Sequence, residues 1–292
     1  MITLLRRRKL GRTSCREISR NMVNPSHVVR NDRINSRRER FRYNPNTQML
    51  IRWGCTSQVP CNNVMNTSNA IQQVNNKLLF RETLNDAELC PPTYFESESA
   101  HDAVDQGKTL VVRPGHHAQG RNLYSVSTHA ELDNAIMRCN RIGAWYASDL
   151  IDKVEEYRVF VGSGRVVWVA RKVPRNPEAI AWNNATGNGV FENVRWGDWN
   201  LKVVRIAIEG YNLSDLHFGG VDVIVDRDNN AYIVEINSAP SQTSPYRQQC
   251  CAKYFDYSFE NGKERIPLIN ERGGWRKFIH PALNEEAYET NN

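Results

Sequence analysis

Residues 221–237 read VDVIVDRDNNAYIVEIN. Two runs rich in β-branched residues, VDVIV and AYIVEIN, flank the polar segment DRDNN, and this pattern predicts an antiparallel hairpin. If the turn is centred between Asp228 and Asn229, Asp222 lies opposite Glu235 with the Cβ atoms roughly 5 Å apart. Asn237 follows Glu235 by two residues and therefore projects from the same face of the strand.

Two facing carboxylates destabilise a sheet unless a cation lies between them. Hard divalent cations prefer such oxygen ligands, and Mg²⁺ usually combines one or two carboxylates with substrate phosphates and water. The hairpin therefore predicts a metal site formed by Asp222, Glu235 and Asn237. A solvated hairpin face that happens to carry two acids is the alternative interpretation.

The composition is that of a globular protein. The length of 292 residues allows one large or two smaller domains, and 40% of the residues are hydrophobic. The sequence contains no run of 18 or more apolar residues, and the opening MITLLRRRKLGR does not have the order of a secretory signal, so we expect a cytoplasmic protein without a membrane span. The seven cysteines form an odd set without metal-type spacing, which favours reduced thiols.

The net charge of +6 is concentrated at the N-terminus, because residues 1–42 contain thirteen Arg or Lys and three acids. Such a segment could be an arm that binds nucleic acid or another polyanion. It could equally be the solvated face of a small N-terminal domain, and no recognised nucleic-acid motif accompanies it.

Apolar periodicity predicts alternating helices and strands with several hairpins, which favours an α+β fold over a doubly wound parallel sheet. Thr128 and Glu131 have capping-box spacing at the start of one of these helices. We expect helices at 69–90, 100–107, 128–143, 196–210 and 247–261, and strands at 49–54, 93–95, 108–114, 123–127, 145–151, 156–161 and 165–173.

Upstream of the hairpin, several basic or polar residues are candidates for anion binding. Arg113 ends a β-branched strand and precedes the loop PGHHAQGRN, whose glycines and free backbone N–H groups suit contact with phosphates. Each candidate has an ordinary surface role as its alternative. The others are Lys77 in a helix, Arg158 and Arg171 on paired strands, and Asn183 and Asn184 in the segment WNNATGNGVF.

The order of these features over residues 75–245 resembles the ATP-grasp superfamily. The strongest match is GGVDVIVDRDNNAYIVEINSAPS, with its D-x12-E-x-N spacing, and the second is ASDLIDKVEEYRVFVGSGRVVWVARKVP. The chain looks most like the ribosomal-protein glutamate-ligase type of carboxylate–amine ligase, including relatives encoded by viruses. The resemblance implies two α+β subdomains that clamp ATP, following a small basic N-terminal region. Its divisions would be 1–75, 76–150, 151–245 and a C-terminal helix and tail at 246–292.

The resemblance also implies roles for individual residues. Asp222, Glu235 and Asn237 would hold Mg²⁺, with Mn²⁺ as an alternative, against the ATP phosphates. The remaining implied contacts are phosphate binding by Lys77, Arg113, His116, His117 and Gly120, adenine binding by Asp149, Leu150 and Ile151, and catalysis by Arg158 and Arg171.

The chain departs from the family pattern in three places. Arg113 replaces a lysine, so a planar fork replaces a point charge. His116 and His117 stand where many relatives have small residues. The segment around Asn183 has Thr186-Gly187-Asn188-Gly189 in place of Arg-Gly-Gly.

In this family a carboxylate attacks the γ-phosphate of ATP, and an amine then displaces phosphate from the acyl phosphate to give an amide. The protein supplies positioning and charge neutralisation, which suits a chain with paired acids and scattered cations but no GxSxG motif. The amine could be an amino acid, a peptide, a polyamine or a modified nucleobase, and the enzyme could form homo-oligomers. The alternatives are a kinase-like phosphotransferase and a nucleic-acid-binding or assembly protein that uses the basic N-terminus.

Overall fold

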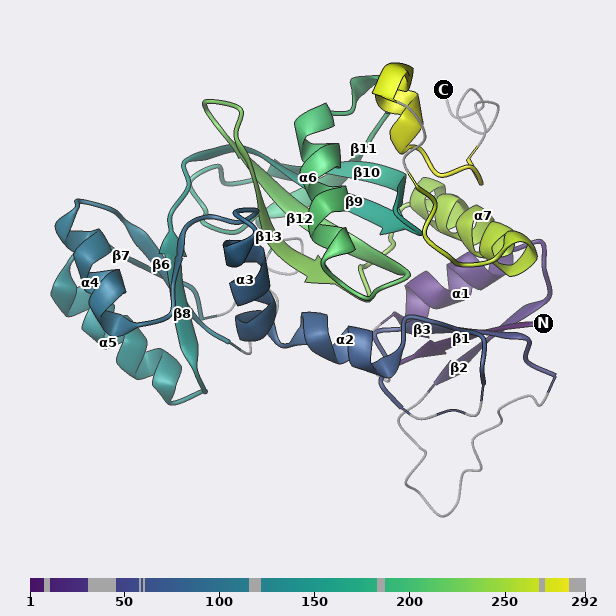
Figure 1. Cartoon of the computed structure of the whole chain (residues 1–292), viewed down its shortest axis with the longest axis horizontal. Coiled ribbons are helices and arrows are strands. Elements are labelled where there is room, and N and C mark those ends of the chain that lie inside the picture. The colour runs from purple at the N-terminus through teal and green to yellow at the C-terminus, as the bar shows by residue number, and fades with distance from the viewer. Residues whose placement is uncertain are drawn as a thin grey trace, which may run out of the picture.

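The structure is a computed structural model, and the part of the chain that it describes forms three β-sheets with helices packed on them (Figure 1). The described residues are 1–7, 11–30, 46–57, 59, 61–115, 122–182, 187–267 and 271–283. The mixture of helices with mainly antiparallel strands confirms the predicted α+β class.

The N-terminal sheet is parallel, with the strand order β2-β1-β3-β4. The predicted strand at 49–54 is β3, and the basic segment before it forms a β-α-β unit in its described part, so it is not a free arm there. The elements are β1 (Ile2–Arg6), α1 (Arg12–Asn21), β2 (Ser26–Arg30), β3 (Met49–Trp53) and β4 (Val64–Met65).

The single helix expected at 69–90 is two helices, α2 (Ser68–Asn75) and α3 (Lys77–Asp86). Asn76 breaks the helix because it ends α2 and its side-chain oxygen accepts a hydrogen bond from the Leu79 N–H at 3.3 Å, which caps α3. The break places Lys77 in the first turn of α3. Asn at a cap competes with the helical backbone, a local choice that apolar periodicity does not reveal.

The middle sheet is antiparallel, with the order β5-β8-β6-β7, and α4 and α5 pack on it (Figure 1). Thr128 and Glu131 form the predicted capping box at the start of α5. The elements are β5 (Thr93–Tyr94), α4 (Ser97–Asp105), β6 (Leu110–Pro114), β7 (Tyr124–Val126), α5 (His129–Asn140) and β8 (Trp145–Asp149).

The largest sheet has the order β11-β10-β9-β12-β13, and every adjacent pair in it is antiparallel. Its edge strand β11 falls in a segment that we expected to be a loop. The elements are β9 (Lys153–Gly162), β10 (Arg165–Pro174), β11 (Gly189–Val194), η2 (Trp196–Asp198), α6 (Leu201–Asn212), β12 (Phe218–Asp226), β13 (Ala231–Asn237), α7 (Pro245–Asn261) and η3 (Glu271–Phe278).

Helix α6 covers one face of this sheet (Figure 1). Gly210 permits the close approach, since a Cβ atom at this position would lie 2.1 Å from Cδ1 of Ile233. Val221, Val223 and Val225 alternate with Asp222 along β12 and are buried in the same core, so Asp222 projects from the other face. The face opposite α6 is therefore available for a site.

Aromatic packing joins the N-terminal sheet to the largest sheet. The Trp53 ring stacks on Phe218 with centroids 5.5 Å apart and meets Phe255 of α7 edge-on at 6.3 Å. Phe160 of β9 stacks on Phe218 at 5.8 Å, and all four rings are completely buried. Because this cluster spans β3, β9, β12 and α7, it fixes the N-terminal sheet beside the central strands.

The seven thiols are free of disulfides, as predicted. No helix among the described residues has both the length and the apolar character needed to cross a membrane.

A partly buried histidine, His217, at the junction of the N-terminal and the largest sheet predicts acid sensitivity. Nδ1 of His217 accepts a hydrogen bond from the Asn66 N–H at 3.0 Å, which requires an unprotonated nitrogen. Burial, with Lys263 and Arg265 nearby, lowers the pKa of His217 from 6.5 to about 4. The unfolded chain therefore binds a proton that the folded chain refuses, and stability falls as the pH drops from about 6.5 towards 4.

We expect His217→Asn, which keeps an acceptor that does not titrate, to remove about 2–3 kcal/mol of that acid-dependent loss. Chemical denaturation at pH 7.5 and at pH 4.5 measures the difference between the two proteins. Burial also lowers the pKa of His280 to about 3. His280 is present in both proteins, so its contribution to the difference in stability cancels. An identical loss in wild type and His217→Asn would contradict the assignment.

Candidate functional site

The β12–β13 hairpin pairs Asp222 with Glu235, as the sequence predicts. The strand register that leads to this pairing differs from that of a regular hairpin. Val225 pairs with Ala231 and Val223 with Ile233, so the turn is centred one half-residue earlier than expected, on Asp228. A β-bulge at Val234 then restores the register before Glu235. The bulge thus decides that the two acids face each other.

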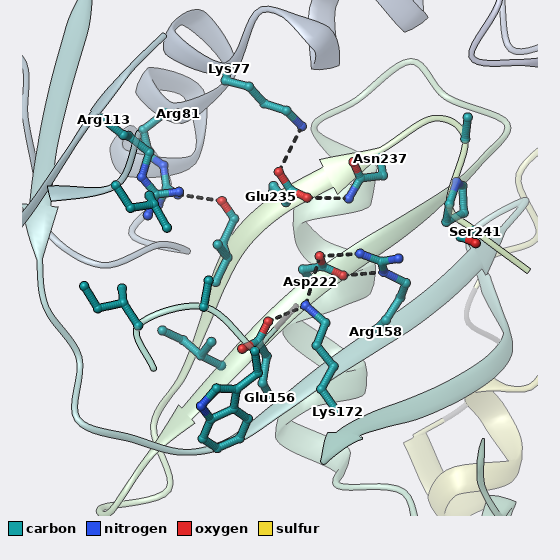
Figure 2. A pocket seen from close by; sticks show the side chains of 18 of the residues that line it. Lys77, Arg81, Arg113, Glu156, Arg158, Lys172, Asp222, Glu235, Asn237 and Ser241 are labelled. Atoms are coloured by element: carbon teal, nitrogen blue, oxygen red, sulfur yellow. Dashed lines mark hydrogen bonds and ion pairs between the residues drawn. The ribbon is translucent and has the colours of Figure 1, made fainter. Parts of the chain in front are cut away.

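Asp222 is 3% exposed and is held by two cations on neighbouring strands (Figure 2). Nε of Arg158 donates to Oδ1 at 2.6 Å and its Nη2 donates to Oδ2 at 2.7 Å, which is the bidentate geometry of a strong guanidinium–carboxylate pair. Nζ of Lys172 lies 3.3 Å from the same Oδ2. Burial alone would lower the pKa of Arg158, and Asp222 more than offsets this, so the pKa is raised.

Lys172 connects Asp222 to a second buried acid, Glu156, which it contacts through Oε1. Lys153 donates to Oε2 of Glu156 at 2.7 Å and lies 4.5 Å above the Trp182 ring. Burial disfavours the charge on Lys172, but Asp222 and Glu156 raise its pKa overall. The four charged groups from β9, β10 and β12 thus form one compensated network, which we call the central ion network: Glu156, Arg158, Lys172 and Asp222.

Arg171 lies outside this network, although we expected it to be a catalytic partner of Arg158. A β-bulge at Val167 shifts β10, so Arg158 pairs with Ala170 instead of Val169. A one-residue shift moves every later side chain to the other face of a strand. Arg171 is consequently half-exposed and pairs with Glu192 at 3.3 Å, and Lys172 occupies the face that we had assigned to Arg171.

Glu235 and Asn237 project together on β13 (Figure 2). Nδ2 of Asn237 donates to Oε1 of Glu235 at 2.8 Å, which leaves the amide oxygen of Asn237 directed elsewhere. Lys77 at the start of α3 donates to the Ile236 carbonyl at 2.9 Å, and its Nζ lies 3.6 Å from Oε2 of Glu235. The structure therefore brings Lys77 beside the predicted metal ligands.

A pair of arginines flanks Tyr146 on the other side of the site. The guanidinium carbons of Arg81 and Arg113 each lie 5.5 Å from the Tyr146 ring centroid. Arg81 donates to the Val234 carbonyl at 2.5 Å, and Figure 2 shows it beside Arg113. Arg113 and Arg81 both line the cavity, but Arg81 has no signal in the sequence beyond its position one helical turn after Lys77.

These groups line one cavity of about 850 Å³ that extends between the three sheets. At one end lie the linker residues Asp149, Leu150 and Ile151, with apolar neighbours including Val111 and Ile224. The central ion network, Glu235 and Asn237 line its middle. At the other end are Arg7, Gly11, Ser14, Trp53 and Gly54 of the N-terminal region, and Ser238, Ala239, Pro240, Ser241 and Thr243 after β13.

The linker is held by its own hydrogen bonds. Asp149 accepts from the Tyr94 hydroxyl at 2.9 Å and lies 3.2 Å from Nζ of Lys108. The Asp149 and Leu150 N–H groups donate to the carbonyls of Pro92 and Thr109. The linker thus presents a fixed polar edge between apolar walls.

Five further candidates, His116, His117, Gly120, Asn183 and Asn184, lie outside the described residues.

Phe191 and Arg247 belong to the site but were not predicted. The Phe191 ring lines the cavity, and three cations surround it: Arg158 at 4.9 Å, Arg247 at 5.3 Å and Lys172 at 5.7 Å. Burial, with Arg158 nearby, lowers the pKa of Arg247 to about 10. The sequence does not indicate these two positions, because β11 and the N-terminal turns of α7 reach the site only through tertiary packing.

The donor set suits a hard cation that shares its coordination with phosphates. Glu235 and Asn237 offer oxygens on one strand, and Asp222 faces them, although Arg158 and Lys172 already contact Asp222. Among the described residues no group of three or more His, Cys, Asp or Glu could enclose a metal ion. The two carboxylates and the amide oxygen of this donor set fit Mg²⁺, which usually takes its remaining ligands from phosphates and water.

Comparison with solved structures shows the fold. The ATP-grasp ligase PsnB complexed with minimal precursor, Mg and ADP superposes with a TM-score of 0.63 at 13% identity, over 90% of this chain and 97% of PsnB. D-alanine–D-alanine ligase from Bacillus anthracis complexed with ATP gives 0.63 at 13% identity, over 90% and 98%. The macrocyclase MdnC from Microcystis aeruginosa MRC bound with precursor peptide MdnA gives 0.60 at 13% identity, over 88% and 100%.

No protein-family model and no curated protein matches the sequence. At this level of identity the structural likeness establishes the ATP-grasp fold, as the sequence resemblance predicted, and the chemistry has to be argued from the site.

Adjacent residues on opposite faces of β10 provide a matched pair of substitutions. Lys172→Met removes a cation from two buried carboxylates, and we expect it to lower stability by about 3 kcal/mol and to weaken nucleotide binding at least about tenfold. Arg171→Met removes an exposed pair, so we expect a change below about 1 kcal/mol and unaltered binding. Chemical denaturation and nucleotide titration measure both. Equal effects of the two substitutions would contradict the placement of Lys172.

Proposed function

We propose that this protein is an ATP-dependent carboxylate–amine ligase that forms an amide through an acyl phosphate. The observation that carries the proposal is the cavity itself, in which a polar linker, a set of cations and the Asp222–Glu235 pair follow one another in line. This order matches a nucleotide whose base, phosphates and reacting partner are laid end to end.

The linker end suits adenine. Val111, Ile151 and Ile224 offer apolar walls for a flat base, and backbone groups of Asp149 to Ile151 lie at its edge. The phosphates would extend towards Lys77 and Arg113, whose charges suit them. The base and phosphate contacts of these residues are part of the proposal.

Asp222, Glu235 and Asn237 would hold Mg²⁺, or Mn²⁺ in its place, which when bound neutralises charge on the transferring phosphoryl group. Arg158 and Lys172 lie on the same strand face as Asp222, so they would hold the carboxylate substrate against the γ-phosphate. The Phe191 ring, which lines the cavity beside these cations, would exclude water, which protects an acyl phosphate from hydrolysis.

The reaction balances without a protein nucleophile. A carboxylate oxygen of the substrate forms a bond to the γ-phosphorus as the bond to the β-bridging oxygen breaks, and ADP leaves. The amine then forms the C–N bond, the acyl C–O bond breaks, and inorganic phosphate leaves as the amine loses a proton. The chain contributes position and fixed positive charge, which lower the barrier to bringing anions together.

The substrate remains open between several classes. PsnB and MdnC were each solved with a precursor peptide, which makes a peptide a reasonable class for one partner here. The resemblance to ribosomal-protein glutamate ligases also favours a peptide or amino acid. The cytoplasm, or the host cytoplasm if a virus encodes the enzyme, stays a prediction. The kinase-like reaction differs only in its acceptor, and nucleic-acid binding by residues 1–42 stays an untested prediction.

Substitution of the hairpin acids tests the metal assignment. We expect Glu235→Gln to reduce Mg²⁺-dependent ATP consumption by at least about a hundredfold, because one hard anionic ligand is lost where charge develops. Asp222→Asn should have a similar effect. Asp228→Asn, in the exposed turn of the same hairpin, is the matched control and should retain activity. ATP consumption that survives both site substitutions would refute the metal assignment.

Hydroxylamine separates the ligase from the phosphotransferase. An acyl phosphate reacts with hydroxylamine to give a hydroxamate, whereas a phosphate ester does not. We expect ATP, Mg²⁺, hydroxylamine and a pool of carboxylic acids to yield hydroxamate in proportion to ADP, and Glu235→Gln to yield none. ADP formation with a phosphorylated hydroxyl product and no hydroxamate would favour the kinase-like reaction.

A further inference from the structure

The N-terminal end of the cavity is built from hydrogen-bond donors. It is lined by Arg7, which follows β1, by Gly11, the N-cap of α1, by Ser14 of α1 and by Trp53 of β3. Gly54, the residue after β3, approaches the segment that follows β13, since a Cβ atom at Gly54 would lie 2.7 Å from the Cβ of Ala239. Gly11 and Ser14 themselves line the cavity, which places the start of α1 there.

The N-terminus of α1 has no acidic side chain in its first turn to offset the helix dipole. The helix spans ten residues, and its N-cap is Gly11 with φ 73°. Gly11 has no side chain with which to cap this first turn. Free N–H groups and the helix dipole at such a position favour an anion.

A second observation points to a ligand at the same place. Nε1 of Trp53 is a completely buried donor, and among the described residues it has no hydrogen-bond partner. The indole edge faces Gly11, because a Cβ atom there would lie 2.6 Å from Cδ1 and 3.2 Å from Nε1 of Trp53. A buried N–H group without an acceptor is costly, so an acceptor supplied by a ligand would relieve that cost.

Ser14 adds a third donor. Its hydroxyl oxygen accepts a hydrogen bond from the Gln242 N–H at 2.9 Å, which leaves the hydroxyl proton for another acceptor. The side chain of Gln242 is completely buried, and both of its polar atoms lack a partner within the described part of the chain. Polar groups at this end of the cavity are thus incompletely satisfied.

The charge of this end is positive. Arg7 supplies a cation there, whereas the acids that line the cavity are at the linker and metal positions and already contact cations. These contacts are Asp149 with Lys108, Glu156 with Lys172, Asp222 with Arg158 and Glu235 with Lys77. No carboxylate among the described lining residues belongs to the N-terminal region.

We infer that the N-terminal end of the cavity binds a second anionic group of the carboxylate substrate, a carboxylate or a phosphate remote from the carboxylate that reacts. The α1 N-terminus, Trp53 Nε1, the Ser14 hydroxyl and Arg7 would hold it. The assignment of this group to the carboxylate substrate rests on the proposed ligase function, while the anion subsite itself rests on the geometry.

The subsite is tested by ¹H–¹⁵N NMR of the tryptophan indole groups in the full-length protein. Trp53→Phe identifies the Trp53 signal by its loss. Inorganic phosphate and succinate are the probes, acetate is the single-charge comparison, and sodium chloride controls for ionic strength. We expect a saturable shift of the Trp53 signal with phosphate or succinate, and which of the two binds more tightly distinguishes a phosphate from a carboxylate group.

Arg7→Gln should weaken the preferred probe about tenfold or more, as loss of a charged hydrogen bond does. Arg16→Gln, which removes the same charge from the exposed side of α1, should not change it. Absence of a saturable Trp53 shift with both probes, or equal weakening in the two variants, would overturn the subsite.

The outcome is independent of ATP turnover. If Trp53 responds to anions but no hydroxamate forms, the subsite stands and the ligase proposal fails. If Glu235-dependent ATP consumption is found without any Trp53 response, the subsite fails alone. With turnover established, equal hydroxamate yields from succinate and propionate at equal concentrations would overturn the assignment of the second anion to the substrate.

Discussion

The bidentate contact between Arg158 and Asp222 is the interaction on which the site depends. Two charges buried between β9 and β12 are tolerated only because each satisfies the other, and Lys172 and Glu156 extend the compensation to β10. The network fixes the face of the sheet that lines the cavity. It also keeps a row of positive charge beside the Asp222–Glu235 pair, where phosphates would bring negative charge.

The same network constrains how a metal could bind. Asp222 would share its oxygens between Arg158, Lys172 and a cation, and Glu235 contacts Lys77 and Asn237. Such sharing favours weak, exchangeable coordination completed by phosphates. A site of this kind would fill and empty with the nucleotide, as the proposed ligase reaction requires.

The N-terminal sheet lines the end of the cavity that is remote from the linker at 149–151. Trp53 serves two purposes, because its ring packs in the aromatic cluster with Phe218 and Phe255 while its N–H group faces Gly11. The packing of the core therefore sets the position of the α1 N-terminus relative to the metal ligands. If the proposed anion subsite is present, coupling of this kind would let a region with few chemical signals in its sequence influence the choice of substrate.

The sequence was most informative where chemistry depends on short-range spacing. The D-x12-E-x-N hairpin, the capping box at Thr128, Lys77, Arg113 and the linker at 149–151 could all be found from pattern and resemblance. The sequence was least informative about the helix break at Asn76, where the signal is a single capping residue, and about strand β11, for which we found no signal. Arg81, Phe191 and Arg247 join the site from separate elements, and a single sequence gives no means of bringing those elements together.

By itself the sequence determined the α+β class, the ATP-grasp resemblance and the identity of the paired acids. Only the tertiary structure decided which neighbouring cation joins them. A bulge at Val167 turns Lys172 towards Asp222 and Arg171 towards solvent, and a bulge at Val234 sets Glu235 opposite Asp222. Strand side chains alternate with a period of two, so one inserted residue reverses the outcome, and bulges depend on packing that spacing alone does not encode.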